Sequence, residues 1–268
     1  MTVQEQSGEA GFEPLQQLER GLAVLQAFSR EHPVLTVSDV ARLTGINRAT
    51  ARRILLTLQE FRFLRSDGRQ FSLTPRVLNL GWGYLSSLGL DEIARPLMQD
   101  LVDAVDESVS LGTLDLPDIV YVARVHTRHI MTVAGGVGSR LPAHATGIGR
   151  VLLAGLPDDE LDRYLADHAL NACTSRTVIE PERLREEIAG VRAAGWALVD
   201  QELELGLRAV AAPIVDAAGR PVAGLSISSA SGRISVQDLT TRCLPQLLET
   251  AGEISLAVAR GVGRMPSA

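Results

Sequence analysis

Residues 36–76 read TVSDVARLTGINRATARRILLTLQEFRFLRSDGRQFSLTPR, and this stretch decides the fold of the first part of the chain. It holds eight arginines against three acidic residues, a local charge of +5. Residues 77–268 hold sixteen arginines against twenty-four acidic residues, and the whole chain of 268 residues has a net charge of −6. A polyanion responds to the field of one surface rather than to the average charge, so this stretch is suited to contact nucleic acid.

The apolar spacing at the start of the stretch predicts two helices joined by a tight turn. Four apolar residues recur at helical spacing, namely Val37, Val40, Ala41 and Leu43. Thr36 or Ser38 can cap the first of these helices, because their hydroxyls accept a hydrogen bond from an unpaired backbone N–H. Gly45 supplies the positive φ that the turn needs, and Asn47 is the expected cap of the second helix.

The second helix, from residue 48 to 58, separates into an apolar face and a basic face. The apolar face consists of Ala51, Ile54, Leu55 and Leu58. The other side, near the helix start, carries Arg48, Ala49, Arg52 and Arg53, with Thr50 and Thr57 at its edge. Such a helix can enter a major groove, since arginine pairs with guanine while threonine and alanine contact the thymine methyl group.

A hairpin follows the helix, with strands at 63–65 and 70–73 around an Asp67-Gly68 turn. Arg65 and Arg69 place positive charge on this wing, which can lie along the DNA backbone or minor groove. The expected DNA-contacting residues are Thr36, Ser38, Asn47, Arg48, Ala49, Thr50, Arg52, Arg53, Arg65 and Arg69. The alternative is a helical hairpin with a solvated charged face, but the wing and the charge segregation favour DNA binding.

The first ninety residues of the chain are expected to form three parts. We expect a disordered polar tail over residues 1–13, a winged helix-turn-helix domain over 14–75 and a linker helix over 76–90. The first helix of the domain carries a stripe of Leu15, Leu18, Leu22 and Leu25, and the linker carries Leu78, Leu85 and Leu88. So small a domain cannot bury the linker stripe, which therefore packs on a partner subunit or, alternatively, on the chain's own second domain.

Residues 91–262 alternate helices with strands joined by tight turns, which predicts an antiparallel sheet flanked by helices and an α+β fold class. The expected helices lie near 91–106, 146–155, 158–168, 181–194 and 236–260. The expected strands lie at 109–114, 119–125, 130–133, 197–199, 209–215 and 222–228.

Composition and motifs exclude several classes of protein. Cys173 and Cys243 are isolated, so neither a disulfide framework nor a metal site is expected. The polar, acidic start is no signal peptide, and no apolar run approaches the ~20 residues of a membrane span, so we expect a cytoplasmic protein without membrane contact. No nucleophile elbow, zinc-protease or phosphate-loop motif occurs, and the GxG pairs lack a third glycine, so neither an enzyme nor a cofactor is expected.

Three motifs in order closely resemble the IclR family of bacterial transcription regulators, over about residues 15–260. They are Arg20-Gly21-Leu22 with the winged segment, LPAHATGIGRVLLAGLP (141–157) and GWALVDQELELGLRAVAAPIVDAAGRPVAGLSISS (195–229). VARVHTRHIMTV (122–133) and VDQELELGLR (199–208) look most like the subgroup that governs aromatic catabolism through β-ketoadipate. The linker stripe and the two-fold symmetry common to operators predict a homodimer or homotetramer. The resemblance implies a second domain resembling a GAF-type sensor with its pocket between the sheet and residues 141–155.

The residues support such a pocket independently. Small residues open the helix at 145–149, so its unpaired N–H groups and dipole can hold a carboxylate, which the resemblance assigns to Gly147 and Ile148. Ser226 and Ser228 are two apart in a strand and project from one sheet face. The expected effector-binding residues are His144, Gly147, Ile148, Asp200, Ser226 and Ser228, with small side chains that can enlarge the pocket at Ala209 and Ala212.

Each of these assignments has an alternative. The pair Gly147 and Gly149 can serve helix–sheet packing, and the two serines can simply be small residues of the sheet. Val199 can take the place of Asp200, and His144 can have a structural role. We therefore expect a regulator of double-stranded operator DNA that responds to a small carboxylate or aromatic acid. The alternative is a winged-helix protein whose second domain only assembles oligomers.

Overall fold

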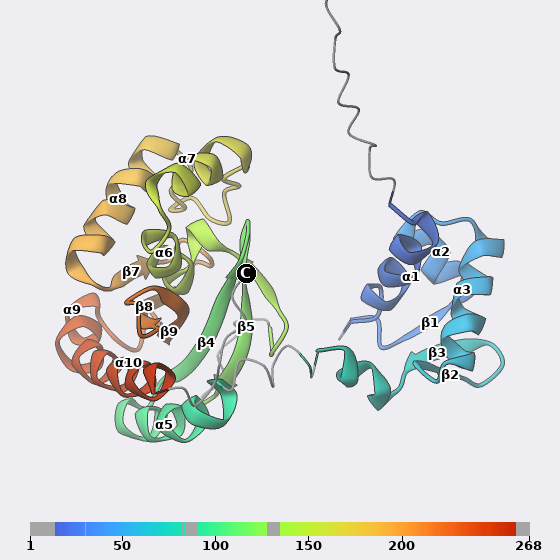
Figure 1. Cartoon of the computed structure of the whole chain (residues 1–268), viewed down its shortest axis with the longest axis horizontal. Helices are drawn as coiled ribbons and strands as arrows, with labels where there is room; N and C mark the ends of the chain where they lie inside the picture. Colours follow the sequence, from blue (N-terminus) through green and yellow to red (C-terminus); the bar gives the residue numbers. More distant parts are fainter. Residues whose placement is uncertain (1–13, 30, 82, 84–89, 128–134, 261–268) are drawn as a thin grey trace, which may run out of the picture. The chain divides into compact units, whose positions relative to one another are not determined.

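The computed structural model describes residues 14–29, 31–81, 83, 90–127 and 135–260 (Figure 1). The chain forms two compact units, residues 1–83 and 84–268, and each is described by itself. The division falls within the segment expected to form the linker helix. Residues 78–81 of that segment are helical, while Leu85 and Leu88 of its expected stripe lie outside the described residues.

The first unit contains helices α1 to α3, further helical turns after the wing, and a three-stranded antiparallel sheet with strand order β1-β3-β2. Its elements are α1 (Gln16–Gln26), β1 (Val34–Thr36), α2 (Val37–Thr44), α3 (Arg48–Glu60), β2 (Leu64–Ser66), β3 (Gln70–Leu73) and the short helix η1 (Pro75–Val77). The winged helix-turn-helix fold expected from the sequence is confirmed. Strand β1 was not predicted, because three residues carry no measurable alternation and its partner strand lies more than thirty residues further along the chain.

Local capping chemistry sets the helix boundaries of this unit. The Thr36 hydroxyl accepts a hydrogen bond from the Asp39 N–H (3.3 Å), and the Asp39 carboxylate accepts one from the Thr36 N–H (3.0 Å). The Thr36 hydroxyl and the Thr36 N–H both donate to the Asp39 carboxylate and lower its pKa. Thr36, rather than Ser38, therefore caps α2. Gly45 adopts a φ of 70° in the turn, and the Asn47 side chain accepts a hydrogen bond from the Thr50 N–H (2.9 Å) at the start of α3.

The core of the first unit corrects the expected face of α1. The buried core residues are Val24, Phe28, Leu35, Val40, Ala51, Leu55, Leu64 and Phe71. By contrast, Leu15, Leu18 and Leu22 are 76%, 62% and 50% exposed. The apolar residue of α1 that packs into the core is Val24, which lies toward the C-terminal end of the helix. Periodicity alone could not choose between two apolar rows on one helix.

The second unit is built on a six-stranded antiparallel sheet with strand order β6-β5-β4-β9-β8-β7. Its strands are β4 (Ser108–Asp115), β5 (Asp118–Val125), β6 (Arg140–Pro142), β7 (Ala197–Asp200), β8 (Leu207–Val215) and β9 (Pro221–Ala230). The expected sheet is confirmed; β6 was not predicted, and the expected strand 130–133 lies outside the described residues. The helices are α5 (Leu90–Val105), η2 (Ala143–Ala145), α6 (Gly147–Ala154), α7 (Asp158–Asp167), α8 (Pro181–Ala194), α9 (Val236–Asp238), η3 (Leu239–Cys243) and α10 (Leu244–Ala259).

The two faces of this sheet differ in chemistry. Helices α5 and α10 cover one face, whereas α6, α7 and α8 lie on the other (Figure 1). The face under α5 and α10 carries large apolar residues, among them Val109, Leu111, Val210, Leu225 and Ile227. The face under α6 carries small or polar residues, namely Ser110, Ala209, Ala211, Ser226 and Ser228. Because these side chains are small, a cavity lies between the sheet and the start of α6.

Among the helices that the structure describes, none is long and apolar enough to cross a membrane.

Candidate functional site

The first candidate site is the exposed face of α3. Arg48, Ala49, Arg52 and Arg53 are exposed, while Ala51 and Leu55 on the opposite side are buried. None of these three arginines forms an ion pair with a described residue. Three guanidinium groups without an ion-pair partner on one helix give this face a positive electrostatic potential, which attracts a polyanion such as DNA.

The remaining residues expected to contact DNA have different surroundings. Ser38 and Asn47 are exposed, and Thr50 is half-buried at the edge of the face. The Thr36 hydroxyl also donates to the Asp39 carboxylate (2.7 Å), so its hydrogen-bonding capacity is used within the capping box. On the wing, the Arg65 Nε donates to the Ser72 hydroxyl (3.0 Å), and Arg69 is exposed at the hairpin tip.

The second candidate site is a cavity in the second unit, between the sheet and the start of α6. About 380 Å³ of space lies within it, a figure that includes the open solvent at its mouth. It is lined by Ile119, Tyr121, Ala145, Thr146, Gly147, Ile148, Val199, Leu203, Leu207, Arg208, Ala209, Ser226 and Ser228. Four of the six expected effector residues are therefore brought together around one cavity.

The N-terminus of α6 presents hydrogen-bond donors to this cavity. The Thr146 hydroxyl caps the helix by accepting from the Gly149 N–H (3.0 Å). The N–H groups of Gly147 and Ile148 have no acceptor within the described part of the chain, and both residues line the cavity. Gly147 also packs tightly on the sheet, since an added Cβ would lie 3.0 Å from the Ala211 Cβ. The site and helix–sheet packing therefore both depend on this glycine.

The opposite wall carries the two serines. Ser226 and Ser228 are 3% and 6% exposed, and neither hydroxyl has a hydrogen-bond partner among the residues described. Their alternation along β9 directs both toward α6, as the sequence predicted. Donors from a helix terminus and two unpartnered hydroxyls thus converge on one small volume with apolar walls, an arrangement that suits a carboxylate.

His144 is placed elsewhere, and its assignment as an effector residue needs correction. Its side chain is buried, and Nε2 lies 3.0 Å from the Asn171 carbonyl oxygen rather than at the cavity. Its own carbonyl accepts a hydrogen bond from the Arg150 Nε (2.7 Å). Burial lowers the pKa of this imidazole. The position supports a structural role in holding the loop before α6.

Asp200 is also absent from the cavity lining, and Val199 takes the position, which was the alternative open in the sequence. Because neighbouring strand residues face opposite sides, Val199 and Asp200 cannot both face the cavity. The Asp200 carboxylate accepts from the Arg208 Nε (2.9 Å) and the Arg176 Nη1 (3.2 Å). Ala209 lines the cavity as expected, but Ala212 belongs to the core under α5 and α10.

Several lining residues were missed from the sequence. Ile119 and Tyr121 form one wall, and Leu203 and Leu207 another. The alternation of β5 was a usable signal for the first pair, because Ile119 and Tyr121 are two residues apart on a predicted strand. Leu203 lies in a loop, where no periodic signal exists.

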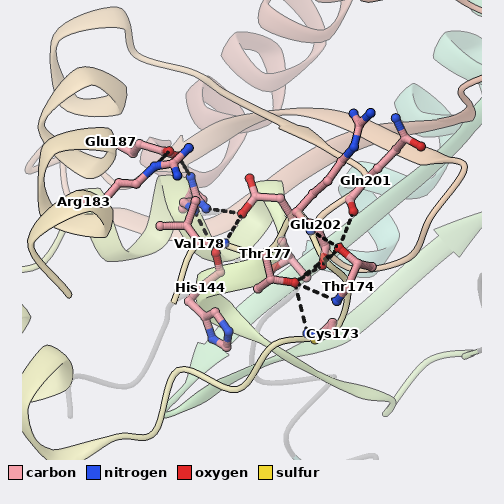
Figure 2. A network of polar contacts seen from close by, with 12 residues as sticks. His144, Cys173, Thr174, Thr177, Val178, Arg183, Glu187, Gln201 and Glu202 are labelled. Atoms are coloured by element: carbon pink, nitrogen blue, oxygen red, sulfur yellow. Dashed lines mark hydrogen bonds and ion pairs between the residues drawn. The ribbon is translucent and has the colours of Figure 1, made fainter. Parts of the chain in front are cut away.

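A buried ionic network holds that loop against α6 (Figure 2). Arg150 is 1% exposed; its Nη2 donates to the Glu202 carboxylate (2.7 Å), and Nη1 pairs with Glu187. The same Glu202 oxygen accepts from the Val178 N–H (3.1 Å). Burial raises the pKa of Glu202, and the Arg150 charge opposes that rise. The network therefore joins the helix that starts at the cavity to the loop that closes it.

The chain is similar in sequence to known DNA-binding regulators. Two family models match: the IclR helix-turn-helix domain over residues 17–68, and the C-terminal domain of bacterial transcriptional regulator IclR over residues 82–256. The Pca regulon regulatory protein of Pseudomonas putida is 43% identical over 253 residues, which cover 94% of this chain and 86% of the relative.

Solved structures give the same result. A candidate transcriptional regulator from Rhodococcus sp. RHA1 is 50% identical with a TM-score of 0.83, covering 92% of this chain and all of its own. An IclR homologue from Microbacterium hydrocarbonoxydans, crystallised with 4-hydroxybenzoate, is 25% identical with a TM-score of 0.81, covering 91% of this chain and 99% of its own. These proteins are transcriptional regulators rather than enzymes, and the resemblance noted in the sequence is confirmed. The chain belongs to the IclR family of DNA-binding bacterial transcriptional regulators.

Proposed function

We propose that this regulator binds its operator through α3 and the wing, and that a small carboxylate bound at the start of α6 changes that binding. The observation that carries the proposal is the convergence of the Gly147 and Ile148 N–H groups with the Ser226 and Ser228 hydroxyls on one cavity. A ligand can shift operator affinity only through its different affinity for two arrangements of the protein, with coupling of about 1–3 kcal/mol.

The effector is proposed to be an acid of aromatic catabolism. Ile119, Tyr121, Leu203 and Leu207 give the cavity apolar walls that suit a ring or a short carbon chain. The relative from M. hydrocarbonoxydans was crystallised with 4-hydroxybenzoate, and the relative from P. putida regulates the Pca regulon. Both facts support an aromatic acid or a ring-cleavage product of the β-ketoadipate pathway as the effector.

The assembly is proposed to be a homodimer or homotetramer, acting in the cytoplasm on double-stranded DNA. Leu15, Leu18 and Leu22 at the start of α1 and Leu78 after the wing are half-exposed or more. Exposed apolar side chains at helical spacing favour contact with a second copy, and paired DNA-binding units match two-fold operators. Light scattering of the full chain at micromolar concentration tests the proposal, and a monomer would contradict it.

A thermal-shift titration tests the sensor function. The full chain is heated with increasing 4-hydroxybenzoate, β-ketoadipate or related acids, and a bound effector raises the unfolding midpoint by mass action. An operator gel shift then shows whether the same acid releases or strengthens DNA binding. If no acid shifts the midpoint or the operator affinity, the second unit only assembles oligomers.

Replacing Arg52 or Arg53 by Ala is expected to weaken operator binding by roughly 1–3 kcal/mol, because both side chains lie unpaired on the exposed face of α3. A base-contacting arginine also contributes specificity at one operator position, so its loss relaxes that preference. A gel shift at physiological salt measures both effects. Arg163→Ala, which removes the same charge from α7 in the other unit, serves as the control. Wild-type affinity in both α3 variants would show that the recognition helix is misassigned.

Ser226→Ala and Ser228→Ala are each expected to raise the effector concentration for half-response by roughly ten-fold or more. Each change removes one hydroxyl donor from the cavity without adding bulk, and a hydrogen bond to a charged ligand contributes about 1.5–3 kcal/mol. Titration of operator binding with effector measures the change. Ser229→Ala is the matched control, because Ser229 is the next residue of β9 and is absent from the cavity lining. An unchanged half-response in both cavity variants would place the effector elsewhere.

A further inference from the structure

Two polar side-chain atoms of the described chain are closed off from solvent and have no hydrogen-bond partner, and they belong to residues that are paired across neighbouring strands. These atoms are the Ser110 Oγ on β4 and the Arg124 Nε on β5. Ser110 and Arg124 are paired across the two strands, and the residues are 0% and 8% exposed. Burial raises the pKa of Tyr121 and a contact with the Ser110 side chain opposes that rise, but the contact does not count as a hydrogen bond to the Ser110 Oγ. Buried polar groups in native proteins are nearly always satisfied, so this pair requires a partner.

The surroundings of Arg124 contain no counter-charge within the part of the chain that is described. Its guanidinium carbon lies 4.9 Å from the centre of the Tyr121 ring, and its Nη1 donates to the Gly135 carbonyl. Burial lowers the pKa of Arg124. The comparison with Arg150 is informative, because that guanidinium is also buried and pairs with Glu187 and Glu202. An uncompensated buried charge is costly, and an anion from outside the chain would remove that cost.

The pair lies beside the effector cavity, although neither Ser110 nor Arg124 is among the residues that line it. Ser110 pairs with Ser226 on its other side, so Ser226, Ser110 and Arg124 form one row across β9, β4 and β5. Directly paired residues of antiparallel strands share a face, which here is the face under α6. Strands lie about 4.8 Å apart, so the Cα atoms of Ser226 and Arg124 are separated by about 10 Å. Tyr121, which lies under the Arg124 guanidinium, itself lines the cavity.

We propose that Arg124 and Ser110 form a second polar end of the effector site and bind the distal carboxylate of a dicarboxylate effector. The proximal carboxylate then occupies the start of α6 beside Ser226 and Ser228, so this inference rests on the proposed sensor function. A guanidinium donating to a carboxylate forms a strong, charge-assisted contact. An acid with one carboxylate leaves the Arg124 Nε unsatisfied, so the second end selects for diacids.

Calorimetric titration of the full chain with matched acids tests the inference. The pairs are adipate against hexanoate and terephthalate against 4-methylbenzoate, in which a methyl group replaces one carboxylate at nearly constant length. The wild type is expected to bind each diacid roughly ten-fold or more tightly than its monoacid. Arg124→Met should remove that preference by weakening diacid binding roughly ten-fold or more, with monoacid binding changed less than about three-fold. The unfolding midpoint of this variant without ligand should stay equal or rise, since a buried uncompensated charge is gone.

Arg140→Met is the matched control, because Arg140 is an exposed arginine of the neighbouring strand β6 that pairs with Asp115 and Asp118. Its diacid preference should equal that of the wild type. A wild type that binds diacids and monoacids alike, or an Arg124→Met variant that keeps the preference, overturns the second polar end and leaves the sensor function standing. A wild type that binds none of the four acids at millimolar concentration overturns the second polar end, whereas the sensor function is decided separately by the thermal-shift titration with 4-hydroxybenzoate and β-ketoadipate.

Discussion

A Gly149→Ala variant is expected to lose roughly 3–5 kcal/mol of unfolding free energy, because the added methyl group would overlap backbone atoms. A Cβ at residue 149 would lie 2.0 Å from the Ala143 carbonyl oxygen and 2.4 Å from the Ala143 Cα. Both atoms belong to backbone, and Ala143 is 0% exposed in the short helix before α6. Relief therefore requires the backbone itself to move, which disturbs the Thr146 cap and the start of α6.

Urea denaturation of the full chain followed by circular dichroism measures this loss. Gly190→Ala is the matched control, since Gly190 is an exposed position inside α8 where an added Cβ meets no atom within 4 Å. Alanine has the higher helix propensity, so the control should gain about 0.5–1 kcal/mol. Equal denaturation midpoints for the two variants would mean that α6 does not approach residue 143 as closely as described.

Glycine at 149 also illustrates which features a sequence can and cannot reveal. The glycine pair at 147 and 149 was open to two interpretations, a ligand site or close packing. Their roles differ in the structure: Gly147 lines the cavity and also packs closely on Ala211, whereas Gly149 permits the contact with Ala143. The sequence contains no local signal for that difference, because Ala143 meets Gly149 through a turn whose path depends on the whole loop.

Features set by local chemistry were predictable. Thr36, Gly45 and Asn47 act within three or four residues of their own position, so their capping and turn roles followed from residue type and spacing. The common face of Ser226 and Ser228 followed from the period of a strand.

Features that depend on distant partners were not predictable. Asp200 was expected at the effector, but its charge is satisfied by Arg208 and Arg176, and the register of β7 against β8 decides this. His144 likewise finds the Asn171 carbonyl, 27 residues away. Ser110 and Arg124 gave no signal singly, since only strand pairing makes them neighbours.

The second large effect is expected for Glu202→Ala, which should lower the unfolding free energy by about 3 kcal/mol or more. Arg150 would keep Glu187 but lose the carboxylate 2.7 Å from its Nη2, and the Val178 N–H would lose its acceptor at 3.1 Å. Removing one partner of a buried ion pair typically costs about 3–5 kcal/mol, because the remaining charge stays desolvated. Urea denaturation gives the value, and Arg163→Ala, whose pair with Asp159 is exposed on both sides, should cost at most about 1 kcal/mol.

The same substitution is expected to weaken effector binding at temperatures where the variant remains folded. The Glu202 carbonyl also accepts from the Thr177 hydroxyl (2.6 Å), so both its backbone and its side chain join the loop to residues 174–178 (Figure 2). Leu203, the next residue, lines the cavity, and a loop released at Glu202 must be ordered again when the effector binds. Glu202→Gln keeps the shape and one acceptor, so its stability and effector affinity should lie between those of wild type and Glu202→Ala. Wild-type stability in the alanine variant would mean that the Arg150 charge is compensated by Glu187 alone, and the loop would then be held to α6 by packing rather than by this ion pair.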